Sequence, residues 1–341
     1  MAKFSEVLTI INGKNQSKVE NPYGKYPIYG SGGIMGYADD YICEPHTVII
    51  GRKGSINKPI FVETPFWNVD TAFGLSANKD VLLPKYLYYF CEHFDFEKLN
   101  TTVTIPSLTK ANLLNIEIEL PTIEQQREIV FQLDNVESIV SLRKQQLSKL
   151  DELVKSRFIE LFGDPITNSN NLPTERMELR FNLKAGITTA ADDIHEFEEG
   201  MYEIPCYGGN GIRGYVREKS YTGNYPIIGR QGALCGNVQY ATGEFHATEH
   251  AVLVSLLKND NSVWVYHLLK LMDLFRYHTG AAQPGLAVKT LNTVEVIVAD
   301  KRKQDQFAAF VEQTDKSKLA IQKSLEKLET LKKVLMQKYF G

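Results

Sequence analysis

Two stretches of the chain, each about 40 residues long, carry a repeating pattern of apolar positions. They cover 122–163 and 300–341 and contain almost no Gly or Pro. Taking positions alternately three and four residues apart, seven of nine are apolar in the first stretch and six of nine in the second. This spacing predicts a long helix with an apolar seam along which it pairs with another helix. The seam positions expected to make that pairing are Leu133, Val136, Val140, Leu147, Leu150, Leu161, Val311, Ile321, Leu325, Leu328 and Leu335.

The residues before each predicted helix follow a different pattern. They are rich in Gly and Tyr, and short β-branched runs at 47–50 and 225–228 predict strands joined by turns. Aromatic and Leu residues gather at 84–99 and 262–277, where each stretch predicts one helix that packs in a core. The fold class predicted for each of these parts is therefore α+β or α/β.

The two halves of the chain are copies of one unit at an offset of 178 residues. Pro27 returns as Pro205, for example, and the last two residues of the first copy, at 162–163, return at 340–341. The repeat predicts four parts related by an internal pseudo-two-fold axis. These are a globular domain at 1–121, a helical region at 122–163, a second globular domain at 164–299 and a second helical region at 300–341.

Polar residues interrupt the two apolar seams at different places, which favours an unlike pair of helices over self-association. Because the first helix joins the two globular domains, a second helix that packs on it must run back as an antiparallel coiled coil. With a rise of 1.5 Å per residue, about 40 residues would form a rod of roughly 60 Å between two similar domains. Arg143 and Arg157 stand where the second copy has Ile321 and Leu335, and Lys318 and Lys332 stand where the first has Val140 and Val154.

Composition places the chain in an ordinary globular class. The apolar fraction is 43% and the charged fraction 23%, which argues against disorder. The sequence holds no apolar run of roughly 20 residues and no signal peptide at its start, so we expect a cytoplasmic protein without a membrane partner. Four cysteines that are well separated in sequence predict reduced, buried thiols rather than a disulfide framework or a zinc site. They are Cys43, Cys91, Cys206 and Cys235.

The charge balance by itself does not support a nucleic-acid partner. Net charge is −3, with 11 basic against 13 acidic residues in 1–121 and 11 against 15 in 164–299. DNA-binding domains usually carry a basic excess. Since phosphate neutralisation supplies most non-specific affinity, any DNA binding by the chain alone is expected to be weak.

Two Gly-bounded loops nevertheless carry side chains suited to reading bases. They lie at 51–55 and 229–233, directly after predicted strands, and their glycines allow the backbone to approach a phosphate while a basic side chain extends. Arg pairs well with guanine and Gln with adenine. The alternative is a tight turn whose Arg is solvated or paired structurally. The candidate readers are Arg52, Lys53, Ser55, Arg230 and Gln231.

Two further pairs of segments are weaker candidates for DNA contact. Thr102, Thr104 and Gln283 lie in small-residue stretches that precede a Pro in each copy. Ser31 and Asn210 lie beside tyrosines that are more often core residues.

The sequence contains no complete catalytic motif that recurs in both copies of the repeat. His246 to His250 has the HxxEH spelling of a zinc peptidase. At the offset of 178 its residues align with 68–72, which hold no matching ligands. Asn21-Pro22-Tyr23 matches only part of a methyltransferase loop, and there is no Walker or Gly-rich cofactor motif. The chain is therefore predicted to be no enzyme, with no catalytic residue and no metal site.

The order of these parts resembles the specificity subunits of type I restriction-modification systems, over essentially the whole chain. The matching motifs are 120–127 (LPTIEQQR), 162–165 (FGDP), and the runs 29–36 and 49–55 with their second copies. The resemblance implies that each domain reads one part of a split double-stranded DNA target and that the helices fix the spacing. The second helical region departs from the family pattern because it lacks a full Leu-Pro-x-x-x-Gln-Gln start.

The resemblance also implies partners that carry out the chemistry. Methyltransferase subunits, two by the pseudo-symmetry, would dock on this chain, and restriction subunits would join them. S-adenosylmethionine, ATP and Mg would bind to those partners, and this chain would hold no cofactor. The complex would methylate adenine and act as a type I site-specific deoxyribonuclease. Two alternatives stay open, a specificity subunit of another methylation-based defence system and a coiled-coil adaptor whose domains bind proteins.

Overall fold

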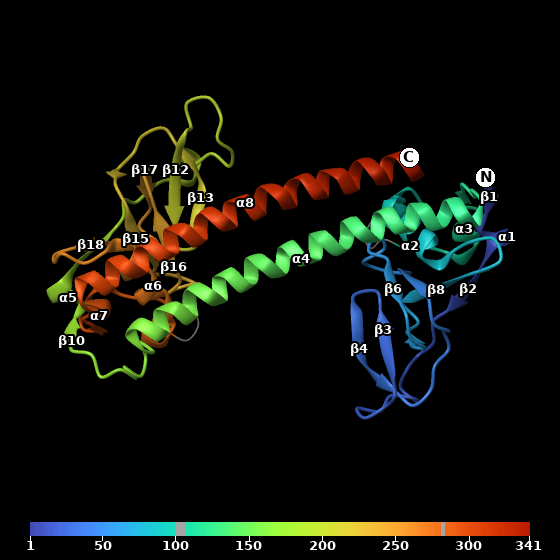
Figure 1. The fold of residues 1–341 in the computed structure, drawn as a ribbon, viewed down its shortest axis with the longest axis horizontal. Coiled ribbons are helices and arrows are strands. Elements are labelled where there is room, and N and C mark those ends of the chain that lie inside the picture. The colour runs from blue at the N-terminus through green and yellow to red at the C-terminus, as the bar shows by residue number, and fades with distance from the viewer. Residues whose placement is uncertain (100–106, 281–283) are drawn as a thin grey trace. The chain divides into compact units, whose positions relative to one another are not determined.

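The computed structural model describes residues 1–99, 107–280 and 284–341, and it forms two compact units (Figure 1). Unit 1 contains Met1–Lys144 and Lys323–Gly341, and unit 2 contains Gln145–Gln322. Each unit therefore combines one globular part with one end of each long helix. We call the globular part before the first long helix head 1, and the one between the two long helices head 2.

Both long helices predicted from the apolar repeat are present. They are α4 (Ile123–Phe162) and α8 (Lys301–Phe340), each 40 residues long. All eleven seam residues named above are buried or half-buried. Within the part of the chain that the structure describes, no helix is long and apolar enough to span a membrane.

Within each unit, the adjoining helix ends run antiparallel. In unit 1 the Tyr339 hydroxyl donates to Gln132 at 2.8 Å, and Lys332 bonds Glu137 at 2.6 Å. In unit 2, Lys318 bonds Asp151 at 2.6 Å. Lys332 and Lys318 are the two charged residues of the α8 seam, and each pairs with a carboxylate of α4. A continuous coiled coil between the units stays a prediction.

Head 1 is built on two small sheets. The first is antiparallel, with strand order β2-β8-β5-β6, and the second has the order β4-β3-β7, in which β3 and β7 are parallel. β1 (Ala2–Lys3) pairs separately with β9 (Glu117–Ile118). The sheet strands are β2 (Leu8–Asn12), β3 (Tyr26–Gly30), β4 (Gly33–Ala38), β5 (Thr47–Gly51), β6 (Ile60–Val62), β7 (Trp67–Asn68) and β8 (Ala72–Ala77). The helices are α1 (Phe4–Val7), α2 (Pro84–His93), the 3-10 helix η1 (Phe96–Leu99) and α3 (Lys110–Leu114).

Head 2 repeats this plan. Its sheets have the orders β11-β18-β15-β16 and β13-β12-β17-β14, and β10 (Thr174–Arg176) pairs with β19 (Glu295–Ile297). The sheet strands are β11 (Phe181–Ala185), β12 (Ile204–Gly208), β13 (Gly211–Val216), β14 (Tyr221–Thr222), β15 (Tyr225–Gly229), β16 (Val238–Ala241), β17 (Glu244–Ala247) and β18 (Ala251–Leu256). The helices are α5 (Met177–Arg180), η2 (Ala191–Asp193), α6 (Ser262–Leu271), η3 (Leu274–Tyr277) and α7 (Val288–Asn292).

The repeat holds in the structure, but its offset varies along the chain. It is 178 residues from β3 and β12 through β5 and β15, and again from α2 and α6 to the end. It is 173 for β2 and β11, because the segment before β12 is longer than the one before β3. It is 179 at β7 and β17, where Ile28 pairs with Trp67 and Cys206 with His246. The alignment of 246–250 with 68–72 was therefore wrong by one residue, because the loop after β15 is one residue longer.

The ends of the long helices complete the cores of the heads. In unit 2, Phe158 and Phe162 of α4 pack with Phe307 of α8, and the ring centroids of Phe162 and Trp264 are 5.7 Å apart. In unit 1, the ring centroids of Phe340 and of Tyr86 in α2 are 5.1 Å apart. Burying an aromatic side chain of this size stabilises a fold by about 1.5–3 kcal/mol. These contacts attach each helix end to a globular core.

A buried glutamine near the start of each long helix ties that helix to its head. Gln126 accepts from the Leu83 amide at 2.8 Å and donates to the Val81 and Pro121 carbonyls, both at 2.9 Å. Gln304 repeats the contact by accepting from the Asn261 amide at 2.8 Å. The second helical region lacks the full motif but keeps this glutamine.

Candidate nucleic-acid interface

In head 1, the loop after β5 is fixed by backbone hydrogen bonds while its side chains stay exposed. The Arg52 and Lys53 amides donate to the Thr71 carbonyl at 2.8 and 3.4 Å, and the Leu108 amide donates to the Arg52 carbonyl at 2.9 Å. The side chains of Arg52, Lys53 and Ser55 are exposed. The loop is thus held rigidly, with a basic pair directed to solvent.

Head 2 holds the corresponding loop in the same way. The Arg230 amide donates to the His250 carbonyl at 3.0 Å, and the Leu286 amide donates to the Arg230 carbonyl at 2.8 Å. Gln231 is exposed, whereas Arg230 is half-buried and its Nε atom is buried without a hydrogen-bond partner among the described residues. An unpaired buried N–H is costly, so a ligand that bonds the Arg230 guanidinium would stabilise this conformation.

Glycines allow the close approaches on which both loops depend. A Cβ atom at Gly51 would lie 2.3 Å from the Ser55 carbonyl oxygen, and one at Gly229 would lie 2.0 Å from the Gly209 carbonyl oxygen. Gly54 and Gly232 each have a φ of +77°, in the region that favours glycine. The two loops therefore share one backbone shape with different side chains.

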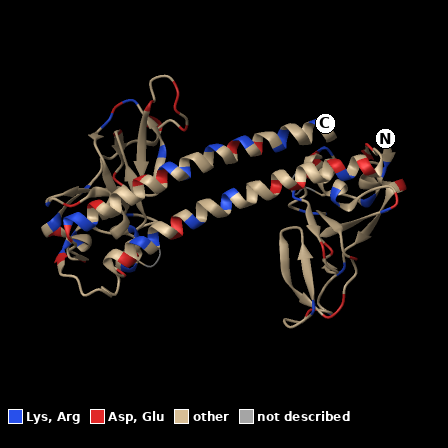
Figure 2. Ribbon diagram, in the orientation of Figure 1, with Lys and Arg blue, Asp and Glu red and all other residues tan. Residues whose placement is uncertain are grey.

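The guanidinium of Arg52 stacks on an aromatic ring and makes no ion pair with any described residue. It lies 5.7 Å from the ring centroid of Phe73. Figure 2 shows Lys, Arg, Asp and Glu interspersed along the long helices. Acidic residues gather on the loop that precedes β12, where 191–203 contains six Asp or Glu and no Lys or Arg. The corresponding segment of head 1, 14–25, contains three Lys and one Glu.

The structure brings the third group of candidates to the Arg52 and Arg230 loops. Ser31 is half-buried, and its Cβ atom lies 3.0 Å from the position of a Cβ at Gly51. Asn210 is exposed and accepts a hydrogen bond from Asn237. Thr102, Thr104 and Gln283 lie outside the described residues.

Sequence reasoning missed one further turn in each head that contacts these loops. It comprises Asp70 and Thr71 after β7, and Glu249 and His250 after β17. The Thr71 and His250 carbonyls accept the loop amides described above. A strand-by-strand alignment with an offset of 179 would have placed Asp70 opposite Glu249 and so revealed the pair.

The residues of the HxxEH sequence motif, 246–250, do not form a metal site. His246 is in β17 and Glu249 is in the turn that follows, so the motif is not helical. His246 Nε2 lies 2.8 Å from the Thr189 hydroxyl, and burial lowers the pKa of this imidazole. Among the described residues, no cluster of His, Cys, Asp and Glu could hold a metal ion.

All four cysteines are buried and form no disulfide. Burial raises the pKa of the Cys43 thiol to about 12 and that of Cys206 to about 11. These thiols are inert at neutral pH because the thiolate is the reactive form.

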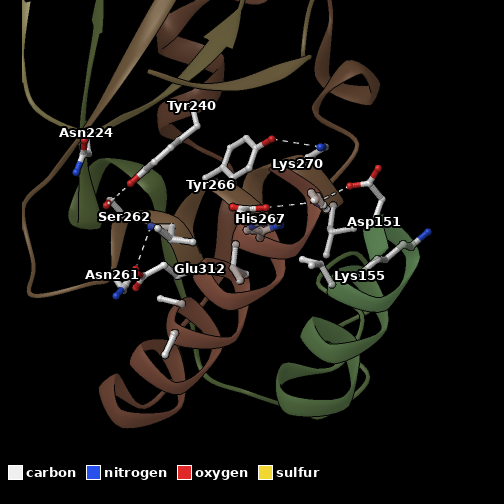
Figure 3. A pocket seen from close by; sticks show the side chains of 18 of the residues that line it. Asp151, Lys155, Asn224, Tyr240, Asn261, Ser262, Tyr266, His267, Lys270 and Glu312 are labelled. Carbon is white, nitrogen blue, oxygen red and sulfur yellow. Dashed lines mark hydrogen bonds and ion pairs between the residues drawn. The ribbon is translucent and has the colours of Figure 1, made fainter. Parts of the chain in front are cut away.

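A groove of about 1080 Å³ lies in unit 2, where α6 meets the adjoining ends of α4 and α8 (Figure 3). The Tyr240 and Tyr266 rings line it, with centroids 5.3 Å apart. His267 also lines it, and burial, aided by Lys270 and Lys318, lowers the pKa of the imidazole to about 3. No residue of the Arg230 loop contributes to its lining.

Comparison with curated proteins identifies a relative over about two thirds of the chain. A curated relative, the type I restriction enzyme EcoprrI specificity subunit of Escherichia coli, is 35% identical over 251 residues. That match covers 68% of this chain and 61% of the relative, so the chain matches less than two thirds of the relative's length.

Two solved structures share the fold. The S subunit of a type I restriction-modification system from M. genitalium gives a TM-score of 0.69 at 18% identity, with 100% of this chain and 95% of that chain covered. A chain from a structural study of complex assembly and conformational transition of the type I R-M system gives 0.58 at 15% identity, with 99% and 96% covered. The model of the type I restriction modification DNA specificity domain matches residues 1–152 and 181–333, one copy in each half. The chain belongs to the family of type I restriction-modification specificity subunits.

Proposed function

We propose that this chain is a non-catalytic subunit that gives a type I restriction-modification complex its DNA sequence specificity. The observation that carries the proposal is the recurrence of one rigid loop, with an Arg at the same position, in both heads. Arg52 and Arg230 each follow a buried strand and a glycine. Arginine at such a position can bond guanine through two hydrogen bonds in the major groove.

Differences between the loops support a target with two unlike parts. Lys53 in head 1 corresponds to Gln231 in head 2, and these side chains favour different base edges. Each head would read one short block of double-stranded DNA. The helices α4 and α8 would hold the heads at a fixed separation, so that the blocks flank a spacer of constant length.

Exposed apolar residues on the long helices support the docking of methyltransferase subunits. Phe131, Leu142 and Leu153 of α4 are 67%, 55% and 48% exposed and lie 11 residues apart. Eleven residues are about three helical turns, so the three side chains share one face. On α8, Leu331 stands at the position that corresponds to Leu153 and is 45% exposed, whereas Phe131 and Leu142 correspond to Ala309 and Ala320. This face would provide a second, less apolar site for a second methyltransferase.

The partners would supply the chemistry. The methyltransferase subunits would bind S-adenosylmethionine, and restriction subunits that join the complex would use ATP and Mg. This chain would contribute DNA recognition and the scaffold, and it would hold no cofactor.

The test is to co-express the chain with the methyltransferase gene beside it and to map methylated adenines across the genome. Methylation at two short blocks around a fixed spacer is the expected result. Arg52→Ala should weaken the preference at one block and Arg230→Ala at the other. Unchanged methylation in the double variant would contradict the assignment of these arginines.

A protein-binding adaptor is the second candidate, because head 2 carries the acidic loop at 191–203. An acidic exposed loop favours a basic partner over a phosphate backbone. The adaptor would be favoured if no methylation depended on this chain. The chain would be assigned to another methylation-based defence system if the genes beside it encoded the subunits of such a system.

A further inference from the structure

The turn after β7 in head 1 places a carboxylate directly beside the basic loop. Thr71 accepts the amides of both Arg52 and Lys53 through its carbonyl, so the preceding residue, Asp70, adjoins that loop. Asp70 is exposed, and its carboxylate makes no ion pair or hydrogen bond with the described residues. The backbone of the turn thus holds the loop, whereas the carboxylate holds no other residue that the structure describes.

Head 2 repeats this arrangement with different residues. The His250 carbonyl accepts the Arg230 amide, and Glu249 precedes it. Glu249 is oriented by two contacts: the Thr189 amide donates to Oε2 at 3.3 Å, and His250 Nε2 lies 3.3 Å from Oε1. The carboxylate remains half-exposed beside the loop.

The register of the strands shows that the two carboxylates are equivalent. The backbone of head 1 pairs Gly51 with Ala72, and that of head 2 pairs Gly229 with Ala251. Two residues before each alanine stands an acidic residue. One fold therefore presents an acid next to its basic loop twice, although head 1 carries Asp and head 2 carries Glu.

A carboxylate on a DNA-facing loop restricts what that loop can contact. It is repelled by phosphates, and it can only accept hydrogen bonds. The major-groove groups that donate hydrogen bonds are the exocyclic amino groups, N4 of cytosine and N6 of adenine. In both heads the residue after the acid accepts the amide of a loop Arg, and that Arg suits guanine. The acid could therefore accept from an amino group of one base while the Arg donates to the N7 and O6 atoms of a neighbouring guanine.

We infer that the turn after β7 and its counterpart after β17 form a second base-reading element in each head. Asp70 and Glu249 each accept a hydrogen bond from the exocyclic amino group of a cytosine or an adenine. This inference rests on the proposed DNA-reading function and assigns specificity to residues outside the Gly-bounded loops. The Thr189 and His250 contacts make Glu249 the more rigid of the two readers.

The test uses the full chain co-expressed with its methyltransferase, with methylated adenines mapped genome-wide. Asp70→Asn and Glu249→Gln keep the shape of each side chain but replace one acceptor by a donor. Each variant should lose preference by about ten-fold or more at one base pair, within a single block, and leave the other block unchanged. The identity of the relaxed base distinguishes cytosine from adenine.

Two controls separate this inference from the proposed function. Glu63→Gln in head 1 and Glu218→Gln in head 2 change exposed carboxylates on other loops, and the methylated motif should not change. If Arg52→Ala alters the motif while Asp70→Asn and Glu249→Gln do not, the inference fails and the proposed function stands. A uniform loss of methylation without a change of motif would also overturn it. If no methylation depends on this chain, both fail.

Discussion

Arg180 and Asp260 form a buried ion pair that exists in only one of the two heads. The guanidinium bonds both carboxylate oxygens at 2.6 and 2.7 Å, and the two side chains are 8% and 3% exposed. The corresponding residues of head 1, Val7 and Leu82, are buried and apolar. The same fold therefore tolerates either a charged pair or an apolar pair at this position.

Arg180→Val alone should lower the free energy of unfolding by about 3–5 kcal/mol, because it leaves the Asp260 carboxylate buried without its cation. The double variant Arg180→Val with Asp260→Leu should recover most of that loss, since it reproduces the pair found in head 1. Urea unfolding of both variants measures the difference. A double variant no more stable than the single one would contradict this account.

His267 should make the stability of unit 2 depend on pH. Its folded pKa of about 3 lies below the ordinary value of 6.5, because burial and the nearby Lys270 and Lys318 disfavour the imidazolium. Protonation therefore favours the unfolded chain, and stability should fall as pH decreases from 6.5 towards 3. Asp151, which lines the same groove, opposes the shift.

His267→Gln should reduce this pH dependence without removing a hydrogen bond to any described residue. The measurement is the free energy of unfolding of wild type and variant at several pH values in that window. The wild type should lose more stability than the variant towards low pH, and above pH 6.5 the difference should be constant. Parallel curves across the whole range would show that the imidazole remains accessible to protons in the folded state.

At the residue scale, the sequence indicated which side chains have the chemistry to contact DNA, but not which residues lie next to one another in the fold. Arg52 and Arg230 could be named as candidate readers because they follow a predicted strand and lie between glycines, and their contact with DNA stays a prediction. Asp70 and Glu249 were not, because their place beside the loops depends on which carbonyl receives the loop amides. A one-residue difference in the loop after β15 displaced the alignment at that point.

At the element scale, the long helices were the most predictable part of the fold. A seven-residue apolar repeat sustained over 40 positions is a strong signal of a helix, whereas short strands leave weaker patterns. The single helices predicted at 84–99 and 262–277 are each divided: an α-helix ends at His93 or Leu271, and after two non-helical residues a separate 3-10 helix follows. Phe158 and Phe340 were not expected in the cores of the heads, because their burial depends on contact with a globular domain rather than on helix pairing.

The exposed face of α4 gives a prediction for partner binding. Leu142→Asp should reduce co-purification of the methyltransferase subunit at least about ten-fold, because it introduces a charge into an apolar contact. Ser148→Asp is the matched control, since Ser148 is exposed on the same helix away from Phe131, Leu142 and Leu153. Equal co-purification of the two variants would exclude this face as the docking surface.

At the scale of the whole molecule, charge limits what the chain can do alone. Net charge is −3, and neither head carries a basic excess. The chain purified alone should therefore bind its target weakly at about 150 mM salt, and the methyltransferase subunits should supply the missing phosphate contacts. A titration of labelled target DNA, with and without the methyltransferase, measures this. Tight sequence-specific binding by the chain alone would contradict it.

The repeat explains why the organisation of the molecule could be predicted while its asymmetry could not. Because the sequence repeats at a fixed offset, each prediction made for one half of the chain applies to the other half as well. The repeat does not predict the acidic segment at 191–203 or the groove lined by His267, because both arise where the copies differ. The separation of the two heads is the remaining prediction at this scale, and the length of the spacer in the DNA target reports on it.

The most direct test of the central claim is a genome-wide map of methylated adenines from cells that express this chain with its methyltransferase, compared with Arg52→Ala and Arg230→Ala. We expect a motif of two short blocks around a spacer of constant length, with each variant altering one block only. A single continuous motif, or methylation that is identical without this chain, would contradict the claim that two heads on paired helices read a split DNA target.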